Sequence, residues 1–318
     1  MEQFFNFDDI KEVYDVLIVG GGPAGLTAGI YAARDNLDTI ILEKNFPGGQ
    51  VGITEMVENY PGFPEGILGG ELSERMFKHA RNFGVQIKNG VCGKVEKDGK
   101  YKIVHLTHGD IKIKTRCIIV ATGAKPMHLN VPGESKFLGR GISFCATCDG
   151  AFYKGREVAV IGGGDSAVEE GNYLTKFASK VHIVHRRDKL RAAKILQDRA
   201  FGNPKVNFIF NSQVARINGE SRIESITLFD KVRNEESDLK VDGVFVFIGW
   251  TADTEVFMGI VEMDKSGFIK TDEHMRTSEE GIFAAGDNRQ KELRQIVTAV
   301  ADGAIAAKSA EKYIQDNF

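Results

Sequence analysis

The sequence has no surplus of either charge. Its 318 residues include 41 Lys and Arg against 44 Asp and Glu, which gives a formal net charge of −3 and an isoelectric point near 6.2. Binding to nucleic acid or to an anionic membrane usually relies on a surplus of positive charge. The composition therefore predicts neither a nucleic-acid partner nor a membrane partner.

A long uninterrupted hydrophobic run is also missing. The most apolar stretch, residues 16–33, contains five glycines and one proline, so it fits a strand, a phosphate-binding loop and a helix better than a membrane span. Residues 1–9 are acidic and have no cationic start before an apolar core, unlike a signal peptide. We expect a soluble, cytoplasmic protein.

Cysteine is scarce, with four in the chain. In a reducing compartment, so few cysteines favour a catalytic pair over a disulfide framework. Cys145 and Cys148 form a Cys-Ala-Thr-Cys sequence that is followed at once by Asp149. A structural zinc site needs four ligands, and no second Cys-x-x-Cys follows at zinc-finger or ribbon spacing. We therefore predict no metal site, and we assign no function to Cys92 or Cys117, which fall in strand-like segments.

Two glycine fingerprints flank the cysteine pair, at residues 20–25 and 162–167. Each follows an apolar run and opens a helical stretch, which is the context that a dinucleotide-binding site requires. A pair of neighbouring thiols between two such sites indicates an electron path. The expected binding residues in the two fingerprints are Gly20, Gly22, Pro23, Ala24 and Gly25, and Gly162, Gly164, Asp165, Ser166 and Ala167.

The residue at the end of the next strand distinguishes the two sites. Glu43 stands 23 residues after Gly20, and an acid there accepts hydrogen bonds from a ribose 2′-hydroxyl, which suits FAD or NAD. The equivalent residue of the second site is His185, followed by Arg186 and Arg187, with Arg191 further on. Guanidinium groups pair with phosphate oxygens, so this site suits NADPH. The alternative is a solvated basic helix start.

The order of predicted elements indicates one α/β domain inserted into another. Residues 278–318 are too few to fold alone and should return to the first domain. We predict an FAD-binding domain at 1–124 and 249–318, and an NADPH-binding domain carrying the cysteine pair at 125–248, with linkers that form a hinge. The main predicted strands are 15–19, 38–43, 85–88, 93–97, 100–107, 111–114, 117–120, 243–249 and 281–285, and the main helices after the fingerprints are 70–83 and 295–316.

Taken in order, these motifs resemble bacterial low-molecular-weight thioredoxin reductases, which are homodimeric FAD enzymes. The resemblance covers nearly the whole chain and implies two Rossmann-like three-layer domains. Its motifs are Gly20-x-Gly-x-x-Gly25, Glu43, Gly48-Gly-Gln50, Glu58-Asn-Tyr-Pro-Gly-Phe-Pro64, Ala121-Thr-Gly123, Cys145-Ala-Thr-Cys-Asp149, Gly162-x-Gly-x-x-Ala167, His185-Arg-Arg187, Gly286-Asp287 and Arg294-Gln295.

The resemblance also implies roles for single residues. Asp287 would bind the ribityl and pyrophosphate region of FAD, and Arg294 and Gln295 would meet its isoalloxazine ring. Alternatively, Asp287 is a helix N-cap without a ligand, and Asp149 merely caps the helix after the cysteines. Further FAD contacts are implied for Gly49, Gln50, Asn59, Thr122, Gly123 and Gly286. Leu293 and the segment at Trp250 depart from the family's usual pattern, so the resemblance does not determine the fine substrate preference.

The implied reaction carries electrons from NADPH through FAD and the Cys145–Cys148 disulfide to thioredoxin or a glutaredoxin-like protein. The resemblance makes Cys148 the cysteine nearer the flavin and implies domain rotation between half-reactions. Asp149 is the only ionisable side chain next to the pair, so it is the expected proton carrier. A flavoprotein NADP reductase would lack the cysteines, a dithiol oxidase would lack the arginines, and a non-enzymatic redox sensor stays open as an alternative.

Overall fold

The computed structural model describes residues 6–54, 56–57 and 59–318, and in it the chain divides into two compact units. What we call the outer unit comprises Met1–Lys125 and Thr251–Phe318, and the inserted unit comprises Pro126–Trp250. The boundaries thus fall after residues 125 and 250, beside the expected 124 and 248. Two short strands, β9 (Ala124–Pro126) and β18 (Trp250–Ala252), contain these crossings and pair with each other.

The outer unit is built on a seven-stranded sheet. Its strand order is β5-β2-β1-β8-β7-β6, in which β5, β2, β1 and β8 are parallel and β7 and β6 are antiparallel to their neighbours. Strand β19 lies outside this order and pairs in parallel with β8. The strands are β1 (Tyr14–Val19), β2 (Thr39–Glu43), β5 (Gln86–Asn89), β6 (Cys92–Asp98), β7 (Tyr101–Leu106), β8 (Lys112–Val120) and β19 (Ile282–Ala284).

Strand β8 corrects one sequence-based expectation. We predicted two strands, 111–114 and 117–120, whereas the structure has one continuous strand. Strand β1 pairs with β8 from Tyr14↔Thr115 to Val19↔Val120, so Thr115, which lies between the two predicted pieces, is itself part of the sheet. The first half of β8 also pairs with β7, and its last three residues pair with β19. The returning C-terminal segment thereby joins the sheet of the outer unit.

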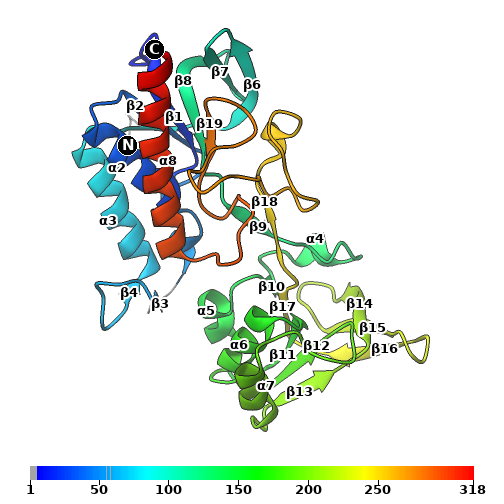
Figure 1. Ribbon diagram of the computed structural model, residues 1–318. Helices are drawn as coiled ribbons and strands as arrows, with labels where there is room; N and C mark the ends of the chain where they lie inside the picture. The colour runs from blue at the N-terminus through cyan, green and yellow to red at the C-terminus, as the bar shows by residue number, and fades with distance from the viewer. Residues whose placement is uncertain (1–5, 55, 58) are drawn as a thin grey trace. The chain divides into compact units, whose positions relative to one another are not determined.

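Helices cover one face of this sheet: α2 (Pro23–Arg34), α3 (Gly69–Asn82) and α8 (Ile296–Asn317), which lie side by side in Figure 1. Val16 and Ile18 of β1 face this helical layer, and Leu17 and Val19 face the opposite core. The approach of α2 to α8 depends on Gly303, because a Cβ there would lie 2.2 Å from the carbonyl oxygen of Ala24. The shorter elements are a 3-10 helix at Gly49–Ile53, β3 (Met56–Val57), β4 (Ile67–Leu68) and a 3-10 helix at Glu255–Phe257.

The inserted unit has three layers around a five-stranded parallel sheet of order β10-β17-β11-β12-β13. Val158 and Val160 of β11 pack with α6 on one face, and Ala159 and Ile161 pack with an antiparallel sheet, β14-β15-β16, on the other. The elements are α4 (Glu134–Phe137), β10 (Ile142–Ser143), α5 (Ala146–Asp149), a 3-10 helix at Gly150–Tyr153, β11 (Glu157–Gly162), α6 (Asp165–Leu174), β12 (Lys180–Val184), α7 (Lys194–Phe201), β13 (Val206–Ile209), β14 (Ser212–Asn218), β15 (Ser225–Asp230), β16 (Glu235–Lys240) and β17 (Gly243–Phe247).

Both units therefore have the Rossmann-like α/β fold that the fingerprints predict, with a parallel sheet at the centre of each. Each fingerprint lies at the carboxyl end of an inner strand of its unit's sheet, β1 or β11, where this fold binds ligands. Among the described helices, none is long and apolar enough to cross a membrane.

Candidate active site

The first fingerprint makes a tight turn between β1 and α2. A Cβ on Gly20 would lie 2.2 Å from the carbonyl oxygen of Ala121, and one on Gly25 would lie 1.9 Å from the carbonyl oxygen of Gly20. These two positions accept only glycine because backbone atoms occupy the space. Gly22 has no atom within 4 Å of its Cβ position. Together with the N-terminus of α2 at Pro23, this open space forms a cradle for a phosphate group.

Glu43 is held against the same loop. Its carboxylate accepts hydrogen bonds from the backbone N–H of Gly21 at 2.7 Å and of Asn45 at 2.8 Å, and the residue is 7% exposed. The loop before the 3-10 helix that contains Gly49 and Gln50 also reaches the fingerprint, since the N–H of Gly48 donates to the carbonyl oxygen of Gly21 at 2.8 Å. Glu43, Gly49 and Gln50 thus come from elements that meet at the glycine loop.

The segment after β19 brings Asp287 to a buried turn. Burial raises the pKa of Asp287, while the positive charges of Lys291 and Arg294 act against that increase. Its Oδ1 atom has no hydrogen-bond partner, although the Lys291 ammonium lies 3.4 Å away. Asn288 is fully buried and donates to the carbonyl oxygen of Val120 at 2.8 Å, which ties the turn to β8. An unbonded buried carboxylate oxygen fits a ligand hydroxyl as its partner.

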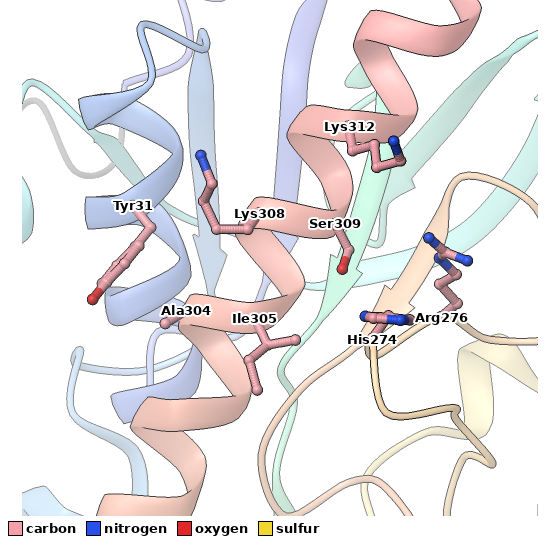
Figure 2. Close-up of a pocket in the computed structure, with 8 residues that line it drawn as sticks. All are labelled: Tyr31, His274, Arg276, Ala304, Ile305, Lys308, Ser309 and Lys312. Atoms are coloured by element: carbon pink, nitrogen blue, oxygen red, sulfur yellow. The ribbon is translucent and has the colours of Figure 1, made fainter.

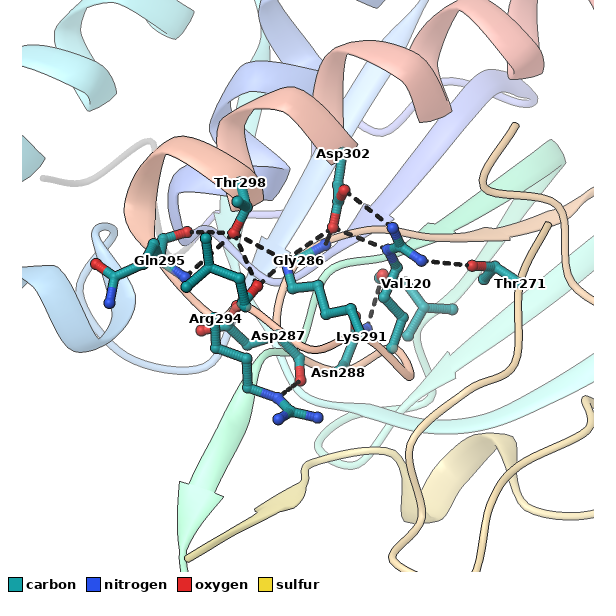
Figure 3. Close-up of polar contacts among 12 residues, drawn as sticks. Val120, Thr271, Gly286, Asp287, Asn288, Lys291, Arg294, Gln295, Thr298 and Asp302 are labelled. Atoms are coloured by element: carbon teal, nitrogen blue, oxygen red, sulfur yellow. Dashed lines mark hydrogen bonds and ion pairs between the residues drawn. The ribbon is translucent and has the colours of Figure 1, made fainter. Parts of the chain in front are cut away.

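Figure 3 shows Asp287, Arg294 and Gln295 near the start of α8, and Asn59 reaches the same place from a distant part of the outer unit. Gln295 caps α8 in a reciprocal pair with Thr298. The side chain of Asn59 donates to that of Gln295 at 2.9 Å, and Arg294 Nε lies 3.4 Å from the carbonyl oxygen of Asp287. Because α8 begins nine residues after Asp287 and its N-cap is Gln295, the alternative interpretation of Asp287 as a helix cap is wrong.

Thr122 and Gly123 follow β8 at the same edge of the sheet. The Asn288 amide lies 3.4 Å from Thr122 Oγ1, and Gly123 has a φ of 72° with no atom within 4 Å of its Cβ position. The predicted FAD contacts thus gather around one edge of the outer unit's sheet. Three features of this edge fit FAD: the tight glycine turn at residues 20–25, the hydrogen-bonded carboxylate of Glu43 at the ribose position, and the Asp287 Oδ1 atom that has no hydrogen-bond partner.

The second fingerprint has the same construction in the inserted unit. A Cβ on Gly162 would lie 2.3 Å from the carbonyl oxygen of Phe247. A Cβ on Gly164 would have free space around it, with Arg191 Nη2 as its only neighbour, at 4.0 Å. The loop that follows β12 folds back onto the fingerprint, since the N–H of Arg191 donates to the carbonyl oxygen of Gly163 at 2.7 Å. Asp165 Oδ1 accepts from the N–H of Ala193 at 2.6 Å.

His185 lies against this glycine loop, with Nδ1 2.3 Å from where a Cβ on Gly163 would be. It is 6% exposed, and its Nε2 atom has no hydrogen-bond partner. Burial lowers its pKa, and the positive charges of Arg191, Arg187 and Arg186 lower it further. The imidazole is therefore neutral at pH 7. The arginines are the positive groups at this site.

The three arginines lie on an exposed loop between β12 and α7. The alternative interpretation, that they form a solvated basic helix start, is therefore wrong about the helix. No ion pair with a carboxylate is found for Arg186, Arg187 or Arg191 within the described residues. Three cations without acidic partners, beside an open glycine turn, fit a ligand with a phosphate on its ribose.

The cysteine pair lies at the one-turn helix α5 of the inserted unit, with Cys145 just before the helix and Cys148 within it. Cys145 is half-buried and disulfide-bonded, and its backbone N–H donates to Ser143 Oγ at 3.0 Å. The backbone of Cys148 belongs to α5, but its side chain lies outside the described part of the structure. Asp149 ends α5 and makes no side-chain capping bond to the 3-10 helix that follows, so the interpretation of Asp149 as a mere cap is wrong.

The two other cysteines are free and buried, as their strand positions suggested. Burial raises the pKa of Cys92 to about 12 and also raises the pKa of Cys117. Thiols with such pKa values are not nucleophiles near neutral pH, because the thiolate is the reactive form. A surface groove of about 500 Å³ between α2, α8 and residues 274–276 is separate from the predicted site, since none of its lining residues belongs to that site (Figure 2).

The fold and the two nucleotide sites define a class of flavin- and nicotinamide-dependent enzymes. A family model for pyridine nucleotide-disulphide oxidoreductases matches residues 14–303. The chain belongs to this family.

Known proteins similar to this chain along nearly its whole length are thioredoxin reductases. The thioredoxin reductase of Bacillus subtilis (strain 168) is 52% identical over 307 residues, which are 96% of each chain. That of Listeria innocua is 50% identical and covers 96% of this chain and 95% of its own. The crystal structure of Lactococcus lactis thioredoxin reductase in its FR conformation has 46% identity and a TM-score of 0.87, covering 95% of this chain and 99% of its own.

Proposed function

We propose that the chain transfers electrons from NADPH, through FAD and a disulfide between Cys145 and Cys148, to the disulfide of thioredoxin or a glutaredoxin-like protein. It is an oxidoreductase of the thioredoxin-disulfide reductase class, with FAD and NADPH as cofactors. The observation that carries the proposal is the Cys145–Cys148 pair at the start of α5, in the same unit as the nucleotide site that fits a 2′-phosphate, within a chain whose other unit has a second nucleotide site. We place the protein in the reducing cytoplasm, which suits its free buried thiols.

When bound, FAD supplies a ring that accepts two electrons from NADPH and donates them to a disulfide. In the outer unit, the α2 N-terminus and Gly22 would hold its pyrophosphate, Glu43 its adenosine ribose, and Asp287 its ribityl chain. In the inserted unit, Gly164 and the α6 N-terminus would hold the NADPH pyrophosphate, and Arg186, Arg187 and Arg191 would hold its 2′-phosphate. These groups bind and orient, and the electron chemistry belongs to the cofactors.

The cysteine pair performs thiol–disulfide exchange. The reduced pair carries two thiols, one of which loses its proton and attacks a sulfur of the partner's disulfide, forming a mixed disulfide and a partner thiolate. The second cysteine then attacks the mixed disulfide, which closes the Cys145–Cys148 bond and releases the partner as a dithiol once it is protonated. We assign Asp149 as the group that takes up and returns these protons, because it adjoins the pair and its side chain has no capping role.

Chain order supports a motion between half-reactions. Cys148 and Gly162 are both in the inserted unit, whereas the first fingerprint is in the outer unit. Both the cysteine pair and NADPH must reach one flavin, so we propose that the inserted unit rotates about the β9 and β18 crossings. A cross-link that locks the two units should leave one half-reaction intact and stop turnover. A locked protein that still completed the whole cycle would overturn the rotation.

We also propose a homodimer, as in the family that the chain resembles. Helices α2 and α8 expose three apolar side chains, Tyr31, Val297 and Ile305. These apolar side chains belong to the outer unit and are consistent with burial against a second copy of the chain.

Anaerobic titration of the purified protein with NADPH tests the proposed function. We expect NADPH to bleach the bound flavin's absorbance, and added thioredoxin to restore it while gaining free thiols. NADH at the same concentration should act more weakly, because it lacks the 2′-phosphate. Rapid flavin reduction without any thioredoxin reduction would contradict the proposed function and favour a redox sensor or an NADP reductase.

A further inference from the structure

One carboxylate of α8 organises the turn that carries Asp287. Asp302 is the seventh residue of α8 and is 5% exposed. Its Oδ2 atom accepts hydrogen bonds from the Gly286 N–H at 3.1 Å, from Arg289 Nε at 2.9 Å and from the Lys291 ammonium at 2.9 Å. Its Oδ1 atom accepts from Arg289 Nη2 at 3.3 Å. Three residues of the turn thus converge on a single side chain (Figure 3).

Lys291 connects this carboxylate to Asp287. Its ammonium lies 2.9 Å from Asp302 Oδ2 and 3.4 Å from Asp287 Oδ1, and its side chain is only 9% exposed. Lys291 also has Thr298 Oγ1 at 3.3 Å. The ammonium therefore contacts three acceptors, one each on Asp302, Asp287 and Thr298. The shortest of these contacts is with Asp302, so we take this carboxylate as the main determinant of where the ammonium lies.

The network is balanced in charge, with two cations and two carboxylates. Removing one member of a buried ion pair leaves an uncompensated charge, which is strongly unfavourable. Without Asp302, the ammonium of Lys291 has Asp287 as its remaining carboxylate partner. We expect Lys291 then to move closer than its present 3.4 Å and to form a hydrogen bond with Asp287 Oδ1, which now has no hydrogen-bond partner.

We propose that Asp302 is a positioning residue for the FAD-binding turn. It holds the Gly286 N–H and makes the closer contact with the Lys291 ammonium, which stays 3.4 Å from Asp287 Oδ1, so that this oxygen remains available to a ligand hydroxyl. Asp302 acts through Asp287 and is not itself assigned a contact with FAD. This role rests on the proposed function, because it requires that the turn bind FAD.

The test is the rate at which FAD leaves the folded holoprotein. In Asp302→Asn, we expect FAD release to be about tenfold faster or more, as for the loss of one charged hydrogen bond. The rate is followed by the rise of flavin fluorescence after dilution. The matched control is Asp316→Asn, which changes an exposed aspartate of the same helix that lies 3.9 Å from Lys312. The control should release FAD at the wild-type rate.

A merely structural role would give a different result. It would lower the melting temperature measured by far-ultraviolet circular dichroism and leave FAD release from the folded protein unchanged, and this outcome overturns the proposal. If Asp302→Asn does not fold, Lys291→Met carries the test, because it removes the ammonium that competes for Asp287 Oδ1 while Asp302 still holds the Gly286 N–H. FAD release from Lys291→Met should then be no faster than from the wild type, and clearly faster release would overturn the proposal. A wild-type protein that binds no FAD overturns the proposed function as well.

Discussion

Cys148→Ser abolishes thioredoxin reduction while NADPH still reduces the bound flavin. A serine cannot form the disulfide that accepts electrons, so turnover with thioredoxin should fall by roughly three orders of magnitude or more, as expected when a covalent nucleophile is removed. The transfer from NADPH to the flavin needs no sulfur and should continue. The two steps are measured separately, by thioredoxin thiols formed and by the reduction of an artificial electron acceptor.

The matched control for this variant is Cys92→Ala. Cys92 is free and buried, and its raised pKa of about 12 keeps the thiol protonated and unreactive. The control should therefore retain thioredoxin reduction at nearly the wild-type rate wherever it folds. A Cys148→Ser protein that reduced thioredoxin at the wild-type rate would remove the cysteine pair from the electron path.

The fingerprints could be predicted from the sequence because their requirements are local. Gly20 and Gly162 have positive φ angles of 110° and 152°, and backbone oxygens lie where a side chain would begin. Such steric limits depend on a few neighbouring residues, so they leave a pattern in the sequence. The position of Glu43 could be predicted for the same reason, since it follows from the length of one strand–helix–strand unit.

Features that depend on distant contacts could not be predicted in this way. Strand β16 gave no clear signal, because it reads Glu-Glu-Ser-Asp-Leu-Lys and is almost wholly exposed. Glu170 has the appearance of an ordinary helical charge, yet burial and the nearby Glu169 raise its pKa to about 7. The role of Asp302 was missed as well, because its partners at 286–291 join it only when α8 packs beside the sheet.

Replacing Arg186 and Arg187 together with alanine should change the nucleotide preference of the enzyme. Both side chains are exposed and have no carboxylate partner among the described ion pairs, so their removal leaves no buried charge behind. Each charged hydrogen bond to phosphate is worth roughly 1.5–3 kcal/mol, or about one to two decades of affinity. We expect NADPH binding to weaken by roughly a hundredfold or more, and NADH binding to change little.

The neutral state of His185 makes this prediction specific to the arginines. Its pKa lies below the ordinary value because of burial and the three neighbouring guanidinium groups, so at pH 7 it adds no positive charge to the site. Dissociation constants of NADPH and NADH, measured by titration at one ionic strength, test the prediction. The control is Arg199→Ala, which removes another exposed arginine of the inserted unit, on α7. If the double variant lost affinity equally for both nucleotides, the arginines would serve the fold of the loop, and the assignment of this site to the 2′-phosphate would be wrong.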